Sequence, residues 1–152
     1  MHRPLRLTID RTALQENWRW LQDRAGVPAG AAIKADGYGL GALESAHALY
    51  HAGCRDFFVS TWAEADALGP LPVGASVVVL HGIGPKDGEA ALNSSARPCL
   101  NTLDQVARWK EIASGRPCDV MIDTGMNRLG LRPTEIGQLD GLAVETLHSH
   151  LA

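Results

Sequence analysis

The sequence predicts an α/β fold in which parallel strands alternate with helices, with a partial (β/α)8 barrel as one of two possible closures of the sheet. Short apolar runs bounded by glycine or proline alternate with segments of helical periodicity along nearly all of the 152 residues. Polar, glycine-bearing loops follow several of these runs, which is where parallel α/β folds place their chemistry. With 45% hydrophobic and 20% charged residues, the composition is that of a globular domain with a substantial core.

Bulk properties exclude several classes of protein. The net charge of −3 argues against a general nucleic-acid-binding surface. The longest fully aliphatic run, residues 77–80, is far shorter than the ~20 residues of a membrane-spanning helix, and residues 1–10 lack the apolar core of a signal peptide. The three cysteines have no C-x-x-C spacing, so a reduced, cytoplasmic setting is expected. Cys99 and Cys118 lie in strand-like runs and are expected to be small core residues.

The first elements are a helix and a buried strand. Asp10 can cap a helix over residues 11–25, and Gly26 can end it. The apolar run at residues 29–34 is bounded by glycine and predicts the first strand. Lys34 would then lie at the carboxyl end, or mouth, of that strand.

Helices and strands alternate through the middle of the chain. A helix is expected over residues 41–50 and a strand over residues 56–60. A short helix over residues 62–68 and a third strand over residues 75–80 follow. A weakly defined helix is expected after the loop at residues 81–85.

The remaining elements continue the alternation. A short strand is expected over residues 97–100, although Pro98 weakens this prediction. Thr102 and Gln105 fit a capping box that opens a helix over residues 103–114. A strand is expected over residues 117–123, a brief helix over residues 134–139 and the last strand over residues 142–147.

This alternation implies a parallel sheet with crossover helices, for which two closures compete. One is an open doubly wound sheet, and the other is a (β/α)8 barrel of the TIM type. About six βα units fit the sequence, whereas a closed barrel needs eight units and about 250 residues. As a barrel, residues 1–152 would form one truncated domain, the N-terminal part of the whole.

Lys34 and the loop after it are the first candidate for chemistry. A lysine walled by apolar neighbours loses hydration, which makes its amine a usable nucleophile or base, as a Schiff-base lysine requires. Gly37, Gly39 and Gly41 permit positive φ and close approach of a ligand, and the loop feeds a helix N-terminus that can bind an anion. Tyr38 could add a hydrogen bond to a phosphate. A lysine and a phosphate-type loop are the two demands of pyridoxal phosphate, although a lysine that only extends into solvent is the alternative.

Two further strand ends carry candidate residues. In the loop at residues 123–130, Arg128 presents a guanidinium that can grip a carboxylate or phenolate through two hydrogen bonds, or it is an ordinary surface arginine. At the last strand end, His148 and His150 share one face because strand side chains alternate. No cysteine or carboxylate cluster is placed to complete a metal site with them, so no metal is expected. A histidine there could instead lie against an aromatic cofactor ring.

Two superficial motifs carry no site. His47 and His51 are four residues apart on a predicted helix but lack the intervening glutamate of a zinc protease. The loop at residues 81–84 lacks the third glycine and the spacing of a dinucleotide fingerprint, which excludes NAD.

Together the three strand-end motifs resemble those of alanine racemase, a fold-type III pyridoxal-phosphate enzyme. The signature A-x-x-K-A-D/N-A-Y-G-H-G is recognisable at residues 31–41, and D-T-G-M-x-R-L-G is intact at residues 123–130. S-H-F-A is matched at residues 149–152, and weaker matches lie at residues 61–65 and 100–103. The resemblance runs over nearly the whole chain but covers only the first part of the family's barrel.

The resemblance implies roles for four residues. Lys34 would hold pyridoxal phosphate covalently and act as the base on one face of the substrate α-carbon. Tyr38 would bind the cofactor phosphate, and His150 would lie on or beside the pyridine ring. Arg128 would bind the phenolic oxygen of the cofactor and the substrate carboxylate. The implied protein is a cytoplasmic homodimer that interconverts L- and D-alanine and supplies D-alanine for peptidoglycan, with a small amino acid as its substrate.

The sequence also departs from the family pattern. Gly37 replaces the usual alanine and Leu40 the usual histidine. Met121 stands where many members carry a carbamylated lysine that orients the arginine. Because methionine cannot carry that negative charge, Arg128 needs another partner, such as an anion or water.

The family's second catalytic base, a tyrosine, lies downstream of the matched region. The 152-residue chain is therefore expected not to racemise alanine alone, and the open sheet edges of a partial barrel are expected to favour association. A pyridoxal-phosphate carrier, a D-amino-acid aldolase or dehydratase, and an inactive truncated product are the alternatives.

Overall fold

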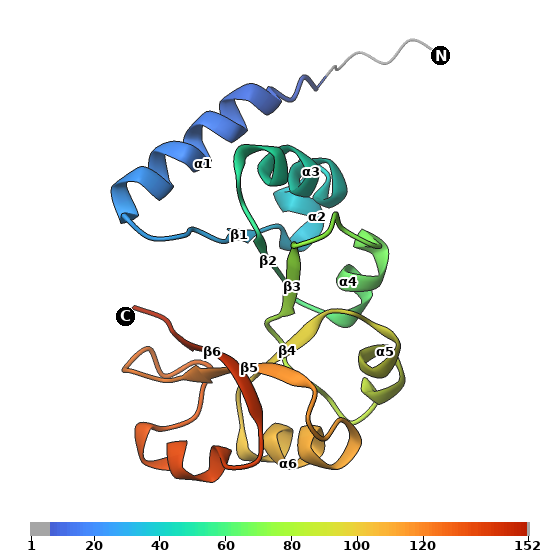
Figure 1. Ribbon diagram of the computed structural model, residues 1–152, viewed down its shortest axis with the longest axis vertical. Coiled ribbons are helices and arrows are strands. Elements are labelled where there is room, and N and C mark those ends of the chain that lie inside the picture. Colours follow the sequence, from blue (N-terminus) through green and yellow to red (C-terminus); the bar gives the residue numbers. More distant parts are fainter. Residues whose placement is uncertain (1–6, 152) are drawn as a thin grey trace.

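The computed structural model describes residues 7–151, and in this range six parallel strands alternate with helices. The strands are β1 (Ala31–Ala32), β2 (Asp56–Val59), β3 (Ser76–Val79), β4 (Arg97–Leu100), β5 (Pro117–Ile122) and β6 (Ala143–Ser149). The helices are α1 (Arg11–Ala25), α2 (Lys34–Tyr38), α3 (Ala42–Ala52), α4 (Trp62–Leu68), α5 (Gly88–Asn93), α6 (Leu103–Ile112) and the 3-10 helix η1 (Pro133–Leu139). Figure 1 shows these elements following one another around a curved sheet.

The order of the strands decides between the two closures. They lie side by side as β1-β2-β3-β4-β5-β6, and every neighbouring pair is parallel. A doubly wound sheet reverses its strand order at a switch point, whereas a barrel adds each strand beside the one before. The fold is therefore a partial (β/α) barrel, as predicted, and the doubly wound alternative is wrong.

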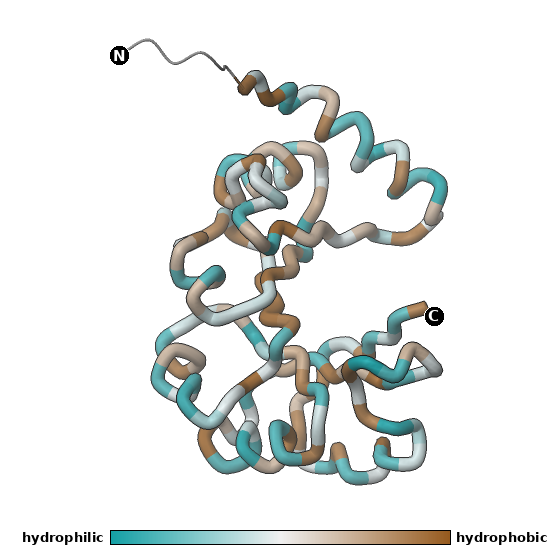
Figure 2. The backbone as a smooth tube through the Cα atoms, turned by 180° about the vertical axis from the view of Figure 1, so that it is seen from behind, coloured by the Kyte–Doolittle hydropathy of each residue, from teal (hydrophilic) through white to brown (hydrophobic). Residues whose placement is uncertain are grey.

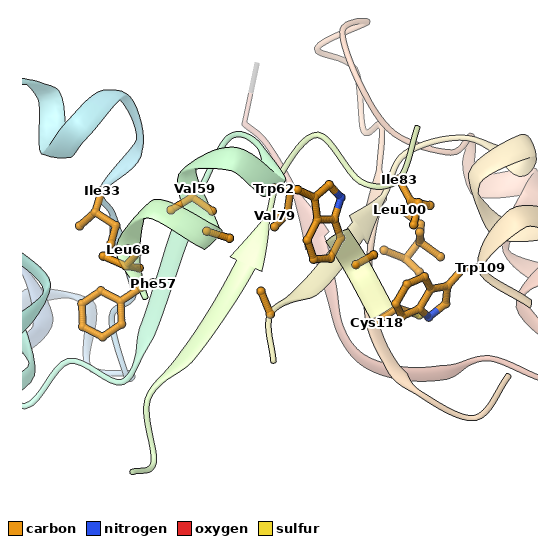
Figure 3. Packing of buried hydrophobic residues seen from close by; sticks show 14 of the residues in the cluster. Ile33, Phe57, Val59, Trp62, Leu68, Val79, Ile83, Leu100, Trp109 and Cys118 are labelled. Atoms are coloured by element: carbon orange, nitrogen blue, oxygen red, sulfur yellow. The ribbon is translucent and has the colours of Figure 1, made fainter. Parts of the chain in front are cut away.

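The hydrophobic core lies between the sheet and the helices on its convex side. Phe57 of β2 and Val79 of β3 are fully buried and belong to one cluster with Trp62 of α4 and Trp109 of α6 (Figure 3). The valine run of β3 is a continuous hydrophobic stretch in the middle of the chain trace (Figure 2). Such strands read as unbroken apolar runs because a parallel sheet buries at least the face that the crossover helices cover.

The prediction that Cys99 and Cys118 are core residues is confirmed. Both are free thiols with 0% exposure, as is Cys54. Desolvation by burial raises the pKa of Cys54 and Cys118 to about 11 and that of Cys99 to about 12. These thiols therefore stay protonated and pack as small apolar side chains.

Most predicted elements agree with the structure to within a few residues, but the first strand does not. The prediction placed a strand over residues 29–34, whereas β1 is only Ala31–Ala32 and Lys34 already belongs to α2. The apolar run continues through Ile33, which is 2% exposed, so its burial is real although its backbone has left the sheet. The last strand, predicted to end at Leu147, continues to Ser149.

Local caps explain where the long helices begin. The Asp10 carboxylate accepts a hydrogen bond from the Ala13 backbone N–H at 3.0 Å and opens α1, as predicted. The Thr102 hydroxyl accepts from the Gln105 N–H at 3.2 Å and opens α6. The indole of Trp18 donates to the Ala29 carbonyl at 3.2 Å and ties α1 to the segment that leads into β1.

Candidate functional site

The candidate residues lie at the carboxyl edge of the sheet. All six strands of residues 7–151 are parallel, so the segments after β1, β5 and β6 emerge at the same edge. Lys34 follows β1, Arg128 follows β5 and His150 follows β6. This edge is where barrels assemble their active sites.

Lys34 opens a left-handed turn, not a strand end as predicted. Ala35, Asp36, Gly37 and Tyr38 all have positive φ, between 52° and 62°. Glycine was expected to supply such angles, but three of the four residues carry a Cβ, which costs about 1 kcal/mol or more at each position. The turn therefore stores backbone strain directly beside Lys34, and the surrounding contacts must hold it.

The turn is held from the side of α3 by Asp36. The backbone carbonyl of Asp36 accepts from the Gly41 N–H at 2.9 Å, and its side chain accepts from the Ala42 N–H at 2.8 Å. The Gly37 N–H donates to the Ile33 carbonyl at 2.8 Å. The side chain of Lys34 is half-buried, whereas that of Tyr38 is 64% exposed.

Glu64 holds the same turn from the side of α4, and the sequence reasoning did not single it out. Its carboxylate accepts from the Ala35 N–H at 2.9 Å, from the Ser60 N–H at 2.5 Å and from the Thr61 N–H at 3.3 Å. Desolvation raises the pKa of Glu64, but these hydrogen bonds and the charge of Lys34 outweigh it and lower the pKa below its usual range. The T-x-x-E spacing of a capping box was the signal that could have found it.

The loop after β5 is ordered by its first aspartate. Asp123 Oδ1 accepts from the Gly125 and Asn127 N–H groups, both at 3.0 Å, and these hydrogen bonds lower the pKa of Asp123. Leu131 closes the loop, because its N–H donates to the Met121 carbonyl and its carbonyl accepts from the Asp123 N–H, both at 2.8 Å. Arg128 is exposed on this closed loop.

The loop after β5 contacts the end of β6. The hydroxyls of Thr124 and Ser149 lie 2.5 Å apart, within hydrogen-bond distance. His150 is exposed, and its Nδ1 lies 2.8 Å from the Leu151 carbonyl. The structure therefore brings the loop of Arg128 and the segment of His150 together. Lys34 and Tyr38 share the turn after β1, and within residues 7–151 no hydrogen bond joins that turn to the loops after β5 and β6.

His148 does not pair with His150 and instead binds a buried carboxylate. Its Nε2 lies 2.7 Å from Asp119 Oδ2, and Arg97 Nε donates to Asp119 Oδ1 at 2.6 Å. Asp119 is 0% exposed, and its neighbours come from β4 and β6. Burial raises the pKa of Asp119, but the hydrogen bonds and charges of His148 and Arg97 outweigh it and lower the pKa below its usual range. The sequence reasoning missed this network, whose only signal was one acid inside an apolar strand.

The described part of the chain offers neither a metal-binding cluster nor a membrane-spanning helix. Among residues 7–151, no three His, Cys, Asp or Glu side chains are grouped so that they could hold a metal ion. No helix in this range is long and apolar enough to cross a membrane.

The parallel strands follow one another in chain order and define the first part of a (β/α) barrel. The candidate site lies at their carboxyl ends, with the lysine turn after the first strand and the segments of Arg128 and His150 after the fifth and sixth. The family model "Alanine racemase, N-terminal domain" matches residues 9–152, and the chain belongs to this family. The resemblance inferred from the motifs is thus confirmed.

Known relatives are longer than this chain. The alanine racemase of Rhizobium meliloti is 44% identical over 134 residues, which cover 86% of this chain and 35% of that protein. Alanine racemase from Bartonella henselae, solved with covalently bound pyridoxal phosphate, superposes with a TM-score of 0.82 and 33% identity over 95% of this chain and 44% of that one. The E. faecalis enzyme superposes with a TM-score of 0.85 and 28% identity over 99% of this chain and 45% of that one. The chain therefore spans less than half the length of these relatives.

Proposed function

We propose that residues 1–152 form the N-terminal, cofactor-binding part of a pyridoxal-phosphate-dependent alanine racemase. The observation that carries the proposal is the Lys34 turn, a half-buried lysine on a strained turn at the same sheet edge as the Arg128 loop. The identity to alanine racemases over most of the chain supports the same reading.

The donor set fits this cofactor. Lys34 supplies an amine for an aldehyde, Arg128 a guanidinium for a phenolate or carboxylate, and His150 a flat imidazole. Among residues 7–151, neither the Lys34 amine nor the Arg128 guanidinium has a hydrogen-bond or ion-pair partner. Both groups therefore need no existing contact to be broken when a ligand enters. When bound, pyridoxal phosphate delocalises the electron pair left on an amino acid α-carbon after deprotonation.

Each site residue has one proposed task. Lys34 attaches the cofactor and then takes or returns the proton on one face of the substrate α-carbon. Arg128 orients the phenolic oxygen of the cofactor and the substrate carboxylate, Tyr38 binds the phosphate, and His150 flanks the ring. Met121 lies beside His148 in the register of β5 and β6 and offers Arg128 no charge, so an anion or water takes that place in the proposal.

The role of the whole protein is proposed on the same basis. We infer that it interconverts L- and D-alanine, acts in the cytoplasm as a homodimer, and supplies D-alanine for peptidoglycan. Three free, buried thiols support a reducing compartment. That the 152-residue chain alone does not racemise alanine stays a prediction, and measurable inversion of alanine by the purified chain would overturn it.

Absorbance spectroscopy tests the cofactor proposal. The chain is mixed with pyridoxal phosphate and its absorption is recorded, and it is then reduced with borohydride and mapped by mass spectrometry. We expect a near-visible band before reduction and a mass increment on Lys34 after it, and both signals should be lost in Lys34→Ala. The matched control is Lys86→Ala, since Lys86 is an exposed lysine between β3 and α5 that forms no hydrogen bond with the Lys34 turn, and its removal should change neither signal. Equal labelling of Lys34 and Lys86 would contradict the proposal.

A further inference from the structure

Glu64 joins the two segments that follow β1 and β2. One carboxylate accepts three backbone hydrogen bonds, from Ala35 at 2.9 Å, Ser60 at 2.5 Å and Thr61 at 3.3 Å. Ala35 belongs to the turn after β1, while Ser60 and Thr61 lead into α4. A single side chain therefore fixes the spacing of two neighbouring strand mouths.

These contacts exceed the needs of a helix cap. In a capping box, the glutamate at the third helical position reaches back to the N–H of the capping residue. Here that bond, to Thr61, is the longest of the three, and the contact to Ala35 crosses to another βα unit 29 residues away. The additional bond is made to the residue directly after Lys34, where the left-handed conformation begins at a φ of 52°.

The charge of Glu64 acts on the backbone and leaves the Lys34 amine free. Among residues 7–151 the two side chains form no ion pair within 4.0 Å, although the positive charge of Lys34 is close enough to help lower the pKa of Glu64. A carboxylate that accepts backbone N–H groups forms charge-assisted bonds, which are about twice as strong as neutral ones. The bond to Ala35 therefore offsets part of the strain of the positive φ angles and stabilises the turn.

We propose that Glu64 is a positioning residue for Lys34, holding the left-handed turn so that the lysine amine is placed to attach the cofactor. This inference rests on the proposed cofactor role of Lys34. It adds that a residue of α4, acting through the backbone of the turn, sets the efficiency with which Lys34 attaches pyridoxal phosphate.

Three variants separate positioning from helix capping. Glu64→Ala removes all three bonds, Glu64→Gln retains one acceptor oxygen without the charge, and Thr61→Ala removes the other half of the capping box while leaving the Ala35 bond intact. The readouts are the equilibrium binding of pyridoxal phosphate to Lys34, measured by its absorption band, and hydrogen exchange at the Ala35 amide.

We expect Glu64→Ala to weaken attachment of pyridoxal phosphate about tenfold or more, because losing one charge-assisted hydrogen bond has an effect of that size. The same variant should speed hydrogen exchange at the Ala35 amide. Glu64→Gln should recover part of both signals, and Thr61→Ala should match the unmodified chain. Equal losses in Glu64→Ala and Thr61→Ala would overturn the proposal, because Glu64 would then act only as a cap. Unchanged attachment in Glu64→Ala would also overturn it.

The two proposals fail differently. If the unmodified chain shows no Lys34-dependent band, the proposed function fails, and the role of Glu64 fails with it even if the Ala35 amide stays protected. If the band is present and depends on Lys34 but not on Glu64, only the positioning role fails.

Discussion

Replacing Asp119 with alanine removes a fully buried carboxylate that joins three neighbouring strands. Asp119 of β5 accepts hydrogen bonds from Arg97 of β4 at 2.6 Å and from His148 of β6 at 2.7 Å. Hydrogen bonds to charged groups contribute about 1.5–3 kcal/mol each, and breaking a buried pair costs about 3–5 kcal/mol. We therefore expect Asp119→Ala to lower the free energy of unfolding by about 4 kcal/mol.

Urea unfolding followed by tryptophan fluorescence measures this loss, since Trp109 is 1% exposed and reports on the core. With a denaturant slope of about 2 kcal/mol/M, the midpoint should fall by about 2 M. Asp23→Ala is the matched control, because Asp23 is an exposed aspartate of α1 whose loss should change stability by less than about 0.5 kcal/mol. Equal midpoints for Asp119→Ala and Asp23→Ala would refute the reasoning that the buried network stabilises the sheet.

The same network predicts the direction of a pH effect. The hydrogen bonds and charges of His148 and Arg97 overcome the opposing effect of burial and depress the pKa of Asp119 in the folded chain. Its stabilising contribution is therefore complete above the unfolded pKa of about 3.9 and is lost as the pH falls through the lower folded value. The difference in stability between the unmodified chain and Asp119→Ala should shrink as the solution is acidified below about pH 4. A constant difference over that range would contradict this account.

Three further predictions concern the loops, the caps and the thiols. Gly130→Ala places a Cβ 2.6 Å from the Asp123 nitrogen, whereas the Cβ of Gly125→Ala meets nothing within 4 Å, and both glycines have a similar φ, of 125° and 132°. Gly130→Ala should therefore lower the free energy of unfolding in urea by about 2 kcal/mol more than Gly125→Ala. Equal losses would contradict the clash. Thr102→Ala should cost about 1 kcal/mol by uncapping α6, and an unchanged midpoint would show that the cap contributes nothing. The buried cysteines should react with an aromatic disulfide reagent only after unfolding, and rapid labelling of the folded chain would oppose their raised pKa values.

The regular elements were predictable because their signals are local. The helix over residues 62–68 agrees with α4, and the strand over residues 56–60 exceeds β2 by one residue. The barrel-type closure was predicted from the family resemblance, because the strand order that selects it is a long-range property that local patterns do not contain. The turn after Lys34 could not be foreseen, because Ala35 and Asp36 adopt angles that their own preferences oppose.

Residues that act through tertiary contacts were the ones missed. Asp119 carries no motif and Glu64 only that of a helix cap, and each role became visible only with its partners from other βα units placed beside it. Lys34, Arg128 and His150 were found because they lie in recognisable strand-end motifs. Local pattern thus located the candidate chemistry, whereas the side chains that hold it needed the folded structure.

Because each strand pairs with the one before it in the chain, this sheet suits assembly during synthesis. Each strand pairs with the strand of the preceding βα unit, so the sheet can grow as a ribosome releases the chain at about 5–20 residues per second. The first unit can form early, yet the turn beside Lys34 is not held until Glu64 arrives 29 residues after Ala35. The Asp119 network closes later still, when His148 of β6 pairs with β5. The nascent chain would therefore fix its lysine turn before its buried charge network.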